Sequence, residues 1–143
     1  MSYLPYDPGV LPTSPAPVSG TRIAFEVEGL PPAKEVGRSI RNVSHPRYSA
    51  FVALRKAATA AMAGRAWSHG PVRLEVVVYL PSFESGPTLL DYFSGIEDTL
   101  DGCSGYTFTY LPIMFEDDCQ VVDASSSLVI SSVKHYSVCV EYL

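Results

Sequence analysis

The stretch VRLEVVVYL, residues 72–80, decides the fold class of this chain. Its apolar side chains form a nearly continuous run after Pro71, which is typical of a strand buried in a sheet. Residues 21–28 alternate apolar and polar side chains and predict another strand. Residues 120–130 and 132–143 are rich in β-forming residues and predict two more.

Two segments between these strands have helical spacing. Residues 47–63 are rich in alanine, place apolar side chains one turn apart, and are followed by Gly64 as a stop. In residues 89–100, apolar side chains recur at intervals of four, three and four. The order strand, helix, strand, helix, strand, strand predicts an α/β or α+β fold, with two helices packed on a small mixed sheet.

The chain length of 143 residues suits one domain. Five of the twelve prolines fall in residues 1–20, which predicts an extended arm before a single domain at 21–143. We find neither an apolar run long enough for a bilayer nor a signal-peptide pattern. The three cysteines lack the spacing of a zinc site. These features predict a cytoplasmic protein with no membrane contact.

Charge is divided unevenly along the chain. Residues 1–73 hold nine of the ten Lys and Arg residues and four acids, whereas residues 74–143 hold Lys134 and eleven acids. Such a division suits a phosphate-binding surface beside a carboxylate cluster, and equally suits two differently decorated surfaces. The bases that we expect to contact DNA phosphates are Lys34, Arg38, Arg41, Arg47 and Lys134.

The acids group in two places. Glu116, Asp117 and Asp118 directly precede a predicted strand, while Asp91, Asp98 and Asp101 lie on or just after the second predicted helix. Hard cations such as Mg²⁺ need several oxygen ligands, so two elements that present acids to one spot are a candidate metal site. The alternative is that these acids are solvated side chains of a helix face and a turn.

Several pieces resemble the RusA family of Holliday-junction resolvases, in the family's order, over residues 23–143. The pieces are the turn GLPPAK at 29–34, PRY at 46–48, GPV at 70–72, IEDTLDG at 96–102, FEDDCQVV at 115–122 and the late Lys134. The resemblance implies a homodimer that binds four-way DNA junctions and cuts them with Mg²⁺ in DNA recombination and repair.

The resemblance also implies which residues would do the chemistry. The family's Asp-x-Asp-Asn motif falls on residues 88–91, so its two metal-binding Asp positions are Thr88 and Leu90 here, and its helix lysine is Ser94. Asp118 matches the second Asp of the family's Asp-Asp-x-Gln motif. We therefore assign catalysis to Asp91, Asp117 and Asp118, and a rearranged Mg²⁺ site to Asp91, Asp98 and Asp118.

Because Thr is a weak ligand and Leu cannot ligate a metal, we expect weakened cation binding. The first hypothesis is therefore a protein that binds branched DNA with impaired or lost nuclease activity. The alternatives are an active, divergent Mg²⁺-dependent resolvase and a protein-interaction module whose partner is another protein.

Overall fold

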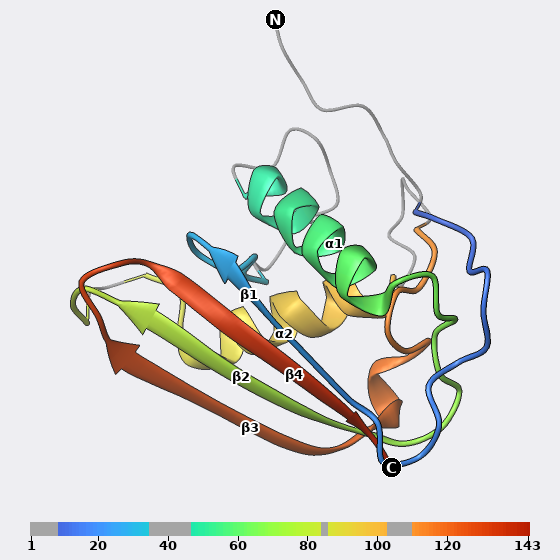
Figure 1. Cartoon of the computed structure of the whole chain (residues 1–143). Helices are drawn as coiled ribbons and strands as arrows, with labels where there is room; N and C mark the ends of the chain where they lie inside the picture. Colours follow the sequence, from blue (N-terminus) through green and yellow to red (C-terminus); the bar gives the residue numbers. More distant parts are fainter. Residues whose placement is uncertain (1–8, 35–46, 84–85, 103–109) are drawn as a thin grey trace, which may run out of the picture.

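The computed structural model describes residues 9–34, 47–83, 86–102 and 110–143. Within them, four strands form one sheet in the order β1-β4-β2-β3 (Figure 1). The strands are β1 (Arg22–Glu28), β2 (Val72–Leu80), β3 (Val121–Ile130) and β4 (His135–Tyr142). β2 pairs in parallel with β3, whereas β4 runs antiparallel to both β1 and β2. The predicted mixed sheet with two helices is confirmed.

Strand β2 lies inside the sheet, as its apolar run predicts, but only one of its faces is covered. Val72, Leu74, Val76 and Val78 are buried at 0–1% exposure, and the side chains between them are half-buried. β4 follows the same alternation and contributes Tyr136, Val138, Val140 and Tyr142 to the core. The core therefore lies on one side of the sheet.

Both helices cover that side, α1 (Tyr48–Met62) and α2 (Leu89–Leu100) (Figure 1). Their apolar stripes bury Phe51, Leu54 and Ala58 from α1 and Ile96 and Leu100 from α2. The helix predicted at 47–63 is one residue shorter at each end. It stops before Gly64 because Ala63 already takes a left-handed conformation, with φ 51°.

The segment after β1 packs tightly on α2 at a glycine. A Cβ on Gly95 would lie 2.2 Å from the carbonyl oxygen of Pro32 and 3.0 Å from the Cα of Ala33. The Lys34 amide then donates to the Asp91 carbonyl oxygen at 3.0 Å. This close approach holds Lys34 alongside α2, where its charge can act on the acids of that helix.

The other face of the sheet carries a row of ion pairs. Arg73 on β2 bonds Asp123 on β3 at 2.8 Å and Glu141 on β4 at 2.9 Å, and Arg22 on β1 reaches Glu141 at 3.3 Å. Farther along the same face, the rings of Tyr79 and His135 stack at 4.1 Å. These pairs join adjacent strands and favour one strand register.

The described part of the proline-rich segment, residues 9–20, lies against the domain. The amides of Thr13 and Ser14 donate to the Gly64 carbonyl oxygen, and Gly20 donates to Tyr142. In the part of the chain that the structure describes, no helix combines the length and the hydropathy needed to cross a bilayer.

Candidate metal centre

Three carboxylates converge where α2 ends. Asp98 comes from the last turn of α2, Asp101 caps that helix, and Asp118 begins the short 3₁₀ helix η1 (Asp118–Gln120). One oxygen of each lies within 4.8 Å of the others. Asp101 is only 2% exposed, whereas Asp118 is exposed to solvent. We call these three residues the acidic cluster, and its all-oxygen donor set could hold a hard cation such as Mg²⁺.

Backbone hydrogen bonds bring the two halves of the acidic cluster together. The amides of Ile113 and Met114 both donate to the Leu100 carbonyl oxygen, so the chain that leads to η1 is fixed to the end of α2. Gly102 makes the turn with φ +62°, and a Cβ there would meet the Leu111 carbonyl oxygen at 2.3 Å. Asp98 and Asp101 are three residues apart and therefore share one helix face.

The Asp-Asp-x-Gln sequence has a structural role in this turn. The Gln120 side-chain oxygen accepts from the amides of Glu116 and Asp117, at 2.8 and 2.9 Å. Its Nε2 donates to the carbonyl oxygens of Ser68 and Gly70, both at 2.8 Å. Asp117 caps η1 by accepting from the Cys119 amide at 3.0 Å. Gln120 and Asp117 therefore position Asp118, and the Asp117 carboxylate is engaged in capping.

We expect Gln120→Leu to lower the free energy of unfolding by about 2 kcal/mol, because it leaves four backbone groups without their partner, two of them partly buried. The urea midpoint measures this loss. Val122→Leu, on a 63% exposed side chain nearby, is the control and should stay within about 0.5 kcal/mol. Equal stability of Gln120→Leu and wild type would show that water replaces these bonds without cost.

The negative charges of the acidic cluster also act on the neighbouring carboxyl group of Glu97. The pKa of Glu97 is raised to about 7, first by burial and then by the charges of Asp118, Asp98 and Asp101, while Lys34 opposes the rise. The pKa of Asp118 is also raised, first by its hydrogen bond with Asp117, whereas the capping bond from Cys119 lowers the pKa of Asp117. The acidic cluster therefore favours uptake of a positive charge, either a proton or a cation.

We expect Glu97→Gln to stabilise the protein above pH 7 in chelator-containing buffer. Between pH 4.5 and about 7 the native state binds more protons at Glu97 than the unfolded state, so stability falls as pH rises through that window. After allowance for solvent screening, the gain at pH 8 should be about 1–2 kcal/mol and should vanish below pH 4.5. Urea unfolding at pH 4 and pH 8 measures it.

The control for Glu97→Gln is Glu26→Gln, which changes an exposed carboxylate on the opposite face of the sheet. Its effect should be small at both pH values. A Glu97→Gln protein that gains no stability at pH 8 would contradict the repulsion described for the acidic cluster.

Asp91 lies at the other end of α2 from the acidic cluster. Its carboxylate accepts from the Thr88 amide at 2.9 Å, and the Thr88 hydroxyl accepts from the Asp91 amide at 3.2 Å, which forms a capping box. Leu90 is 73% exposed. Seven residues of helix separate Asp91 from Asp98 by about 10 Å along the axis. Of the three residues predicted to bind the metal, Asp98 and Asp118 lie together in the structure. The third carboxylate beside them is that of Asp101, in place of Asp91.

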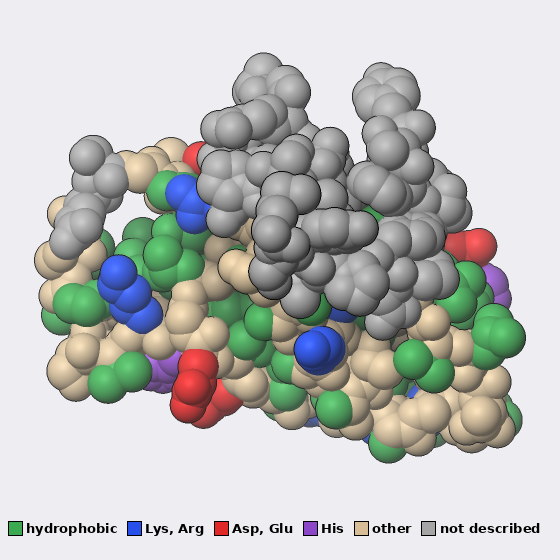
Figure 2. All heavy atoms as spheres, turned by 90° about the horizontal axis from the view of Figure 1, so that it is seen from above, with side chains coloured by type: hydrophobic (Ala, Val, Ile, Leu, Met, Phe, Trp, Pro, Cys, Tyr) green, Lys and Arg blue, Asp and Glu red, His purple; other side chains and the backbone are tan. Residues whose placement is uncertain are grey.

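The predicted DNA-binding bases lie in two places. Lys34 is close enough to the acidic cluster to lower the pKa values of Glu97 and Asp118. Arg47 and Lys134 both line a hollow beyond the end of β2. In the space-filling view, basic side chains border a hollow that hydrophobic side chains line at that end of the molecule (Figure 2). Arg38 and Arg41 lie outside the described residues.

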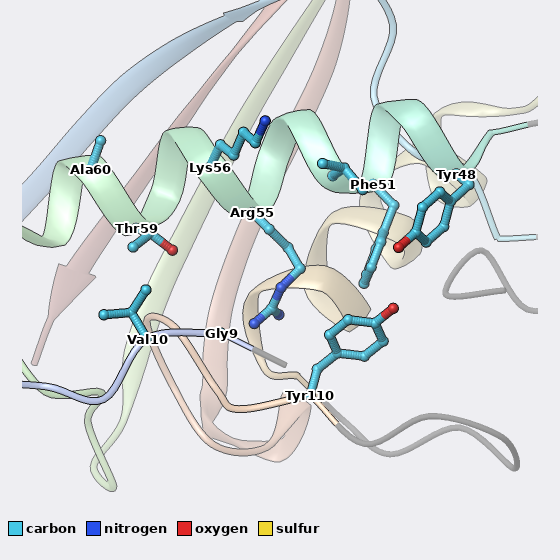
Figure 3. Close-up of a pocket in the computed structure, with 10 residues that line it drawn as sticks. Gly9, Val10, Tyr48, Phe51, Arg55, Lys56, Thr59, Ala60 and Tyr110 are labelled. Atoms are coloured by element: carbon cyan, nitrogen blue, oxygen red, sulfur yellow. The ribbon is translucent and has the colours of Figure 1, made fainter. Parts of the chain in front are cut away.

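A second cavity, of about 390 Å³, lies between α1 and the segment that begins at Tyr110. Figure 3 shows the Arg55 side chain pointing from α1 toward Gly9 and Tyr110. The guanidinium donates to the carbonyl oxygens of Thr99 at 3.2 Å and Leu111 at 2.9 Å. Arg55 therefore ties α1 to the end of α2 and to the segment at Leu111.

Comparison of the chain with models of protein families and with curated proteins finds no match. The likeness to RusA-type resolvases therefore rests on the motifs at 29–34, 96–102 and 115–122. Sequence reasoning left Asp101 and Glu97 out of the proposed ligand set. The three-residue spacing between Asp98 and Asp101 was the signal that could have placed Asp101 with Asp98 on one face.

Proposed function

We propose that this protein binds branched DNA and cleaves it with the help of a divalent cation held by the acidic cluster. The observation that carries the proposal is the approach of Asp98, Asp101 and Asp118 to within 4.8 Å. These residues come from two of the segments that resemble the RusA family, 96–102 and 115–122. A bound Mg²⁺ would supply an activated water and would offset charge on the leaving oxygen.

Charge near the acidic cluster supports a nucleic-acid substrate. Lys34 is held beside α2 by its backbone bond to Asp91, and it is exposed. Arg47 and Lys134 line the hollow that Tyr92 also lines, next to Asp91 in the first turn of the same helix. One base beside a carboxylate cluster and two more toward the other end of the helix can contact successive backbone phosphates, which gives affinity that depends on salt.

A second candidate function is binding of branched DNA without cleavage. It is favoured by the first turn of α2, where Thr88 and Asp91 are engaged in a capping box and Leu90 cannot ligate a metal. A cation site built from the remaining carboxylates has fewer donors than the resemblance implies.

The test is a cleavage assay on a synthetic four-way junction with Mg²⁺ or Mn²⁺. We expect wild type to cut the junction, and Asp118→Asn to cut at least about 100-fold more slowly because the cluster loses a ligand. Asp91→Asn is the matched control, since it changes an acid of α2 outside the acidic cluster, and it should cut at close to the wild-type rate.

A gel shift across a salt series and a thermal-unfolding titration separate the outcomes. Mn²⁺ should raise the unfolding temperature of wild type and leave that of Asp118→Asn unchanged. Salt-sensitive binding without cleavage would favour the second candidate. A protein that neither binds nor cuts the junction would contradict both.

A further inference from the structure

Strand β3 forms an outer edge of the sheet. Within the residues that the structure describes, its only partner strand is β2, and no segment lies beyond its outer edge (Figure 1). The helices cover it only in part, because Leu74 on β2 is fully buried whereas its register partner Ala124 on β3 is exposed. The residues that border the three longer undescribed segments lie by α1 and α2; they are Gly9, Lys34, Arg47, Gly102 and Tyr110.

The sequence of β3 lacks the features that keep an edge strand unpaired. Natural edge strands carry lysine, proline or other charged side chains, which prevent a further strand from adding to the sheet. β3 reads VVDASSSLVI and holds one charged residue, Asp123, whose carboxylate bonds Arg73 at 2.8 Å. β1, the opposite edge strand, carries Arg22, Glu26 and Glu28. Of the two edges, β3 is therefore the one that suits a further strand.

Exposed apolar side chains lie at both ends of β3. Val122 is 63% exposed near its start, Val129 and Ile130 are 40% and 52% exposed at its end, and serines occupy the middle. An antiparallel copy of the same strand, centred on these serines, places the apolar start of each copy against the apolar end of the other. Small side chains then meet at the centre without steric conflict. The strand is therefore complementary to itself.

We propose that β3 is the surface at which a second copy of this chain binds, by antiparallel pairing of the two β3 strands about a two-fold axis. This pairing joins two four-stranded sheets into one, gives the backbone groups of both outer edges their hydrogen-bond partners, and covers the exposed valine and isoleucine side chains. Asp118 lies just before β3, so each acidic cluster sits at an end of the joined edge and not at its centre. The inference goes beyond the proposed function and does not rest on it.

Analytical ultracentrifugation of the full chain over a concentration series tests the proposal. Pairing along one edge is a small interface, so the dimer should be weak, with a dissociation constant on the order of micromolar. Ser125→Lys and Ser125→Glu each bring like charges together across the two-fold axis, and each should raise the dissociation constant at least about tenfold. An equal mixture of the two variants should associate as wild type does, because the charges that meet are then opposite.

Ala24→Lys is the matched control, because Ala24 is a small, exposed residue on the other edge strand, β1, and this variant should associate as wild type does. Far-UV circular dichroism checks that each variant folds. The same two substitutions at Ser127, which is also exposed, repeat the test if the Ser125 variants do not fold. In hydrogen exchange, residues 121–130 should gain protection as the protein concentration rises, whereas residues 22–28 should not.

A wild-type protein that stays monomeric at every concentration would overturn the proposal. Folded Ser125→Lys that associates as tightly as wild type would also overturn it, as would a mixture of the two charged variants that stays monomeric. Association that is lost in Ala24→Lys and kept in Ser125→Lys would assign the interface to β1 instead. These measurements are made without DNA, so their outcome is separate from that of the junction assays.

Discussion

Replacement of Gly95 by alanine is expected to lower the free energy of unfolding by about 2–3 kcal/mol. Helix propensity alone predicts the opposite, since alanine is favoured over glycine by about 1 kcal/mol inside a helix. The added Cβ, however, would lie 2.2 Å from the carbonyl oxygen of Pro32 and 2.6 Å from its carbonyl carbon. Both atoms belong to backbone, so the overlap cannot be relieved by a side-chain rotation.

Relief would require the segment that ends at Lys34 to move away from α2, although Ala33 is fully buried there. The urea midpoint of Gly95→Ala measures the cost. Ser94→Ala, at the preceding position of the same helix, is the control and should be neutral or slightly stabilising. If Gly95→Ala proves as stable as Ser94→Ala, the close approach of α2 to Pro32 does not persist in solution.

Arg55→Met should lower the free energy of unfolding by about 3 kcal/mol, although methionine preserves most of the apolar stem of the side chain. Arg55 is 7% exposed, and its guanidinium bonds two carbonyl oxygens from separate segments, those of Thr99 and Leu111. It also lies 4.9 Å from the centre of the Tyr110 ring, on the wall of the cavity in Figure 3. Loss of the charge removes this cation–π contact and leaves the buried Thr99 carbonyl short of a donor.

Thermal and urea unfolding measure the effect of Arg55→Met. The neighbouring Lys56 is exposed, so Lys56→Met is the matched control and should stay within about 0.5 kcal/mol of wild type. Because Leu111 leads into the segment that carries Asp118, Arg55→Met should also weaken Mn²⁺ binding at the acidic cluster. A stable Arg55→Met protein would show that the buried charge costs as much to desolvate as its bonds return.

The elements themselves could be predicted well. The alternation at 21–28, the apolar run at 72–80 and the helical spacing at 89–100 all match the observed strands and helix within one residue. These patterns are local, because a strand with one covered face repeats every two residues and a one-sided helix every 3.6. The main difference is β2, whose nearly continuous apolar run is typical of a buried strand, whereas only its helix-facing side is covered.

The candidate site was only partly predictable. The sequence indicated Asp98 and Asp118 but grouped them with Asp91, which is instead engaged with Thr88 in a capping box. Helix spacing gave Asp91 and Asp98 the same face, yet the third carboxylate had to lie at the end of α2 that meets η1. That meeting depends on the bonds to Leu100 and on the turn at Gly102, which no local pattern predicts.

Sequence alone determined the strands, the helices and the segregation of bases from acids along the chain, since each of these depends on neighbouring residues. Only the tertiary structure decided the strand order β1-β4-β2-β3 and the approach of Asp101 to Asp118. It also decided that Arg47 and Lys134 line the same hollow. The physical reason is that these features join residues far apart in the chain, and packing of α2 on the sheet and on Pro32 fixes which distant groups meet.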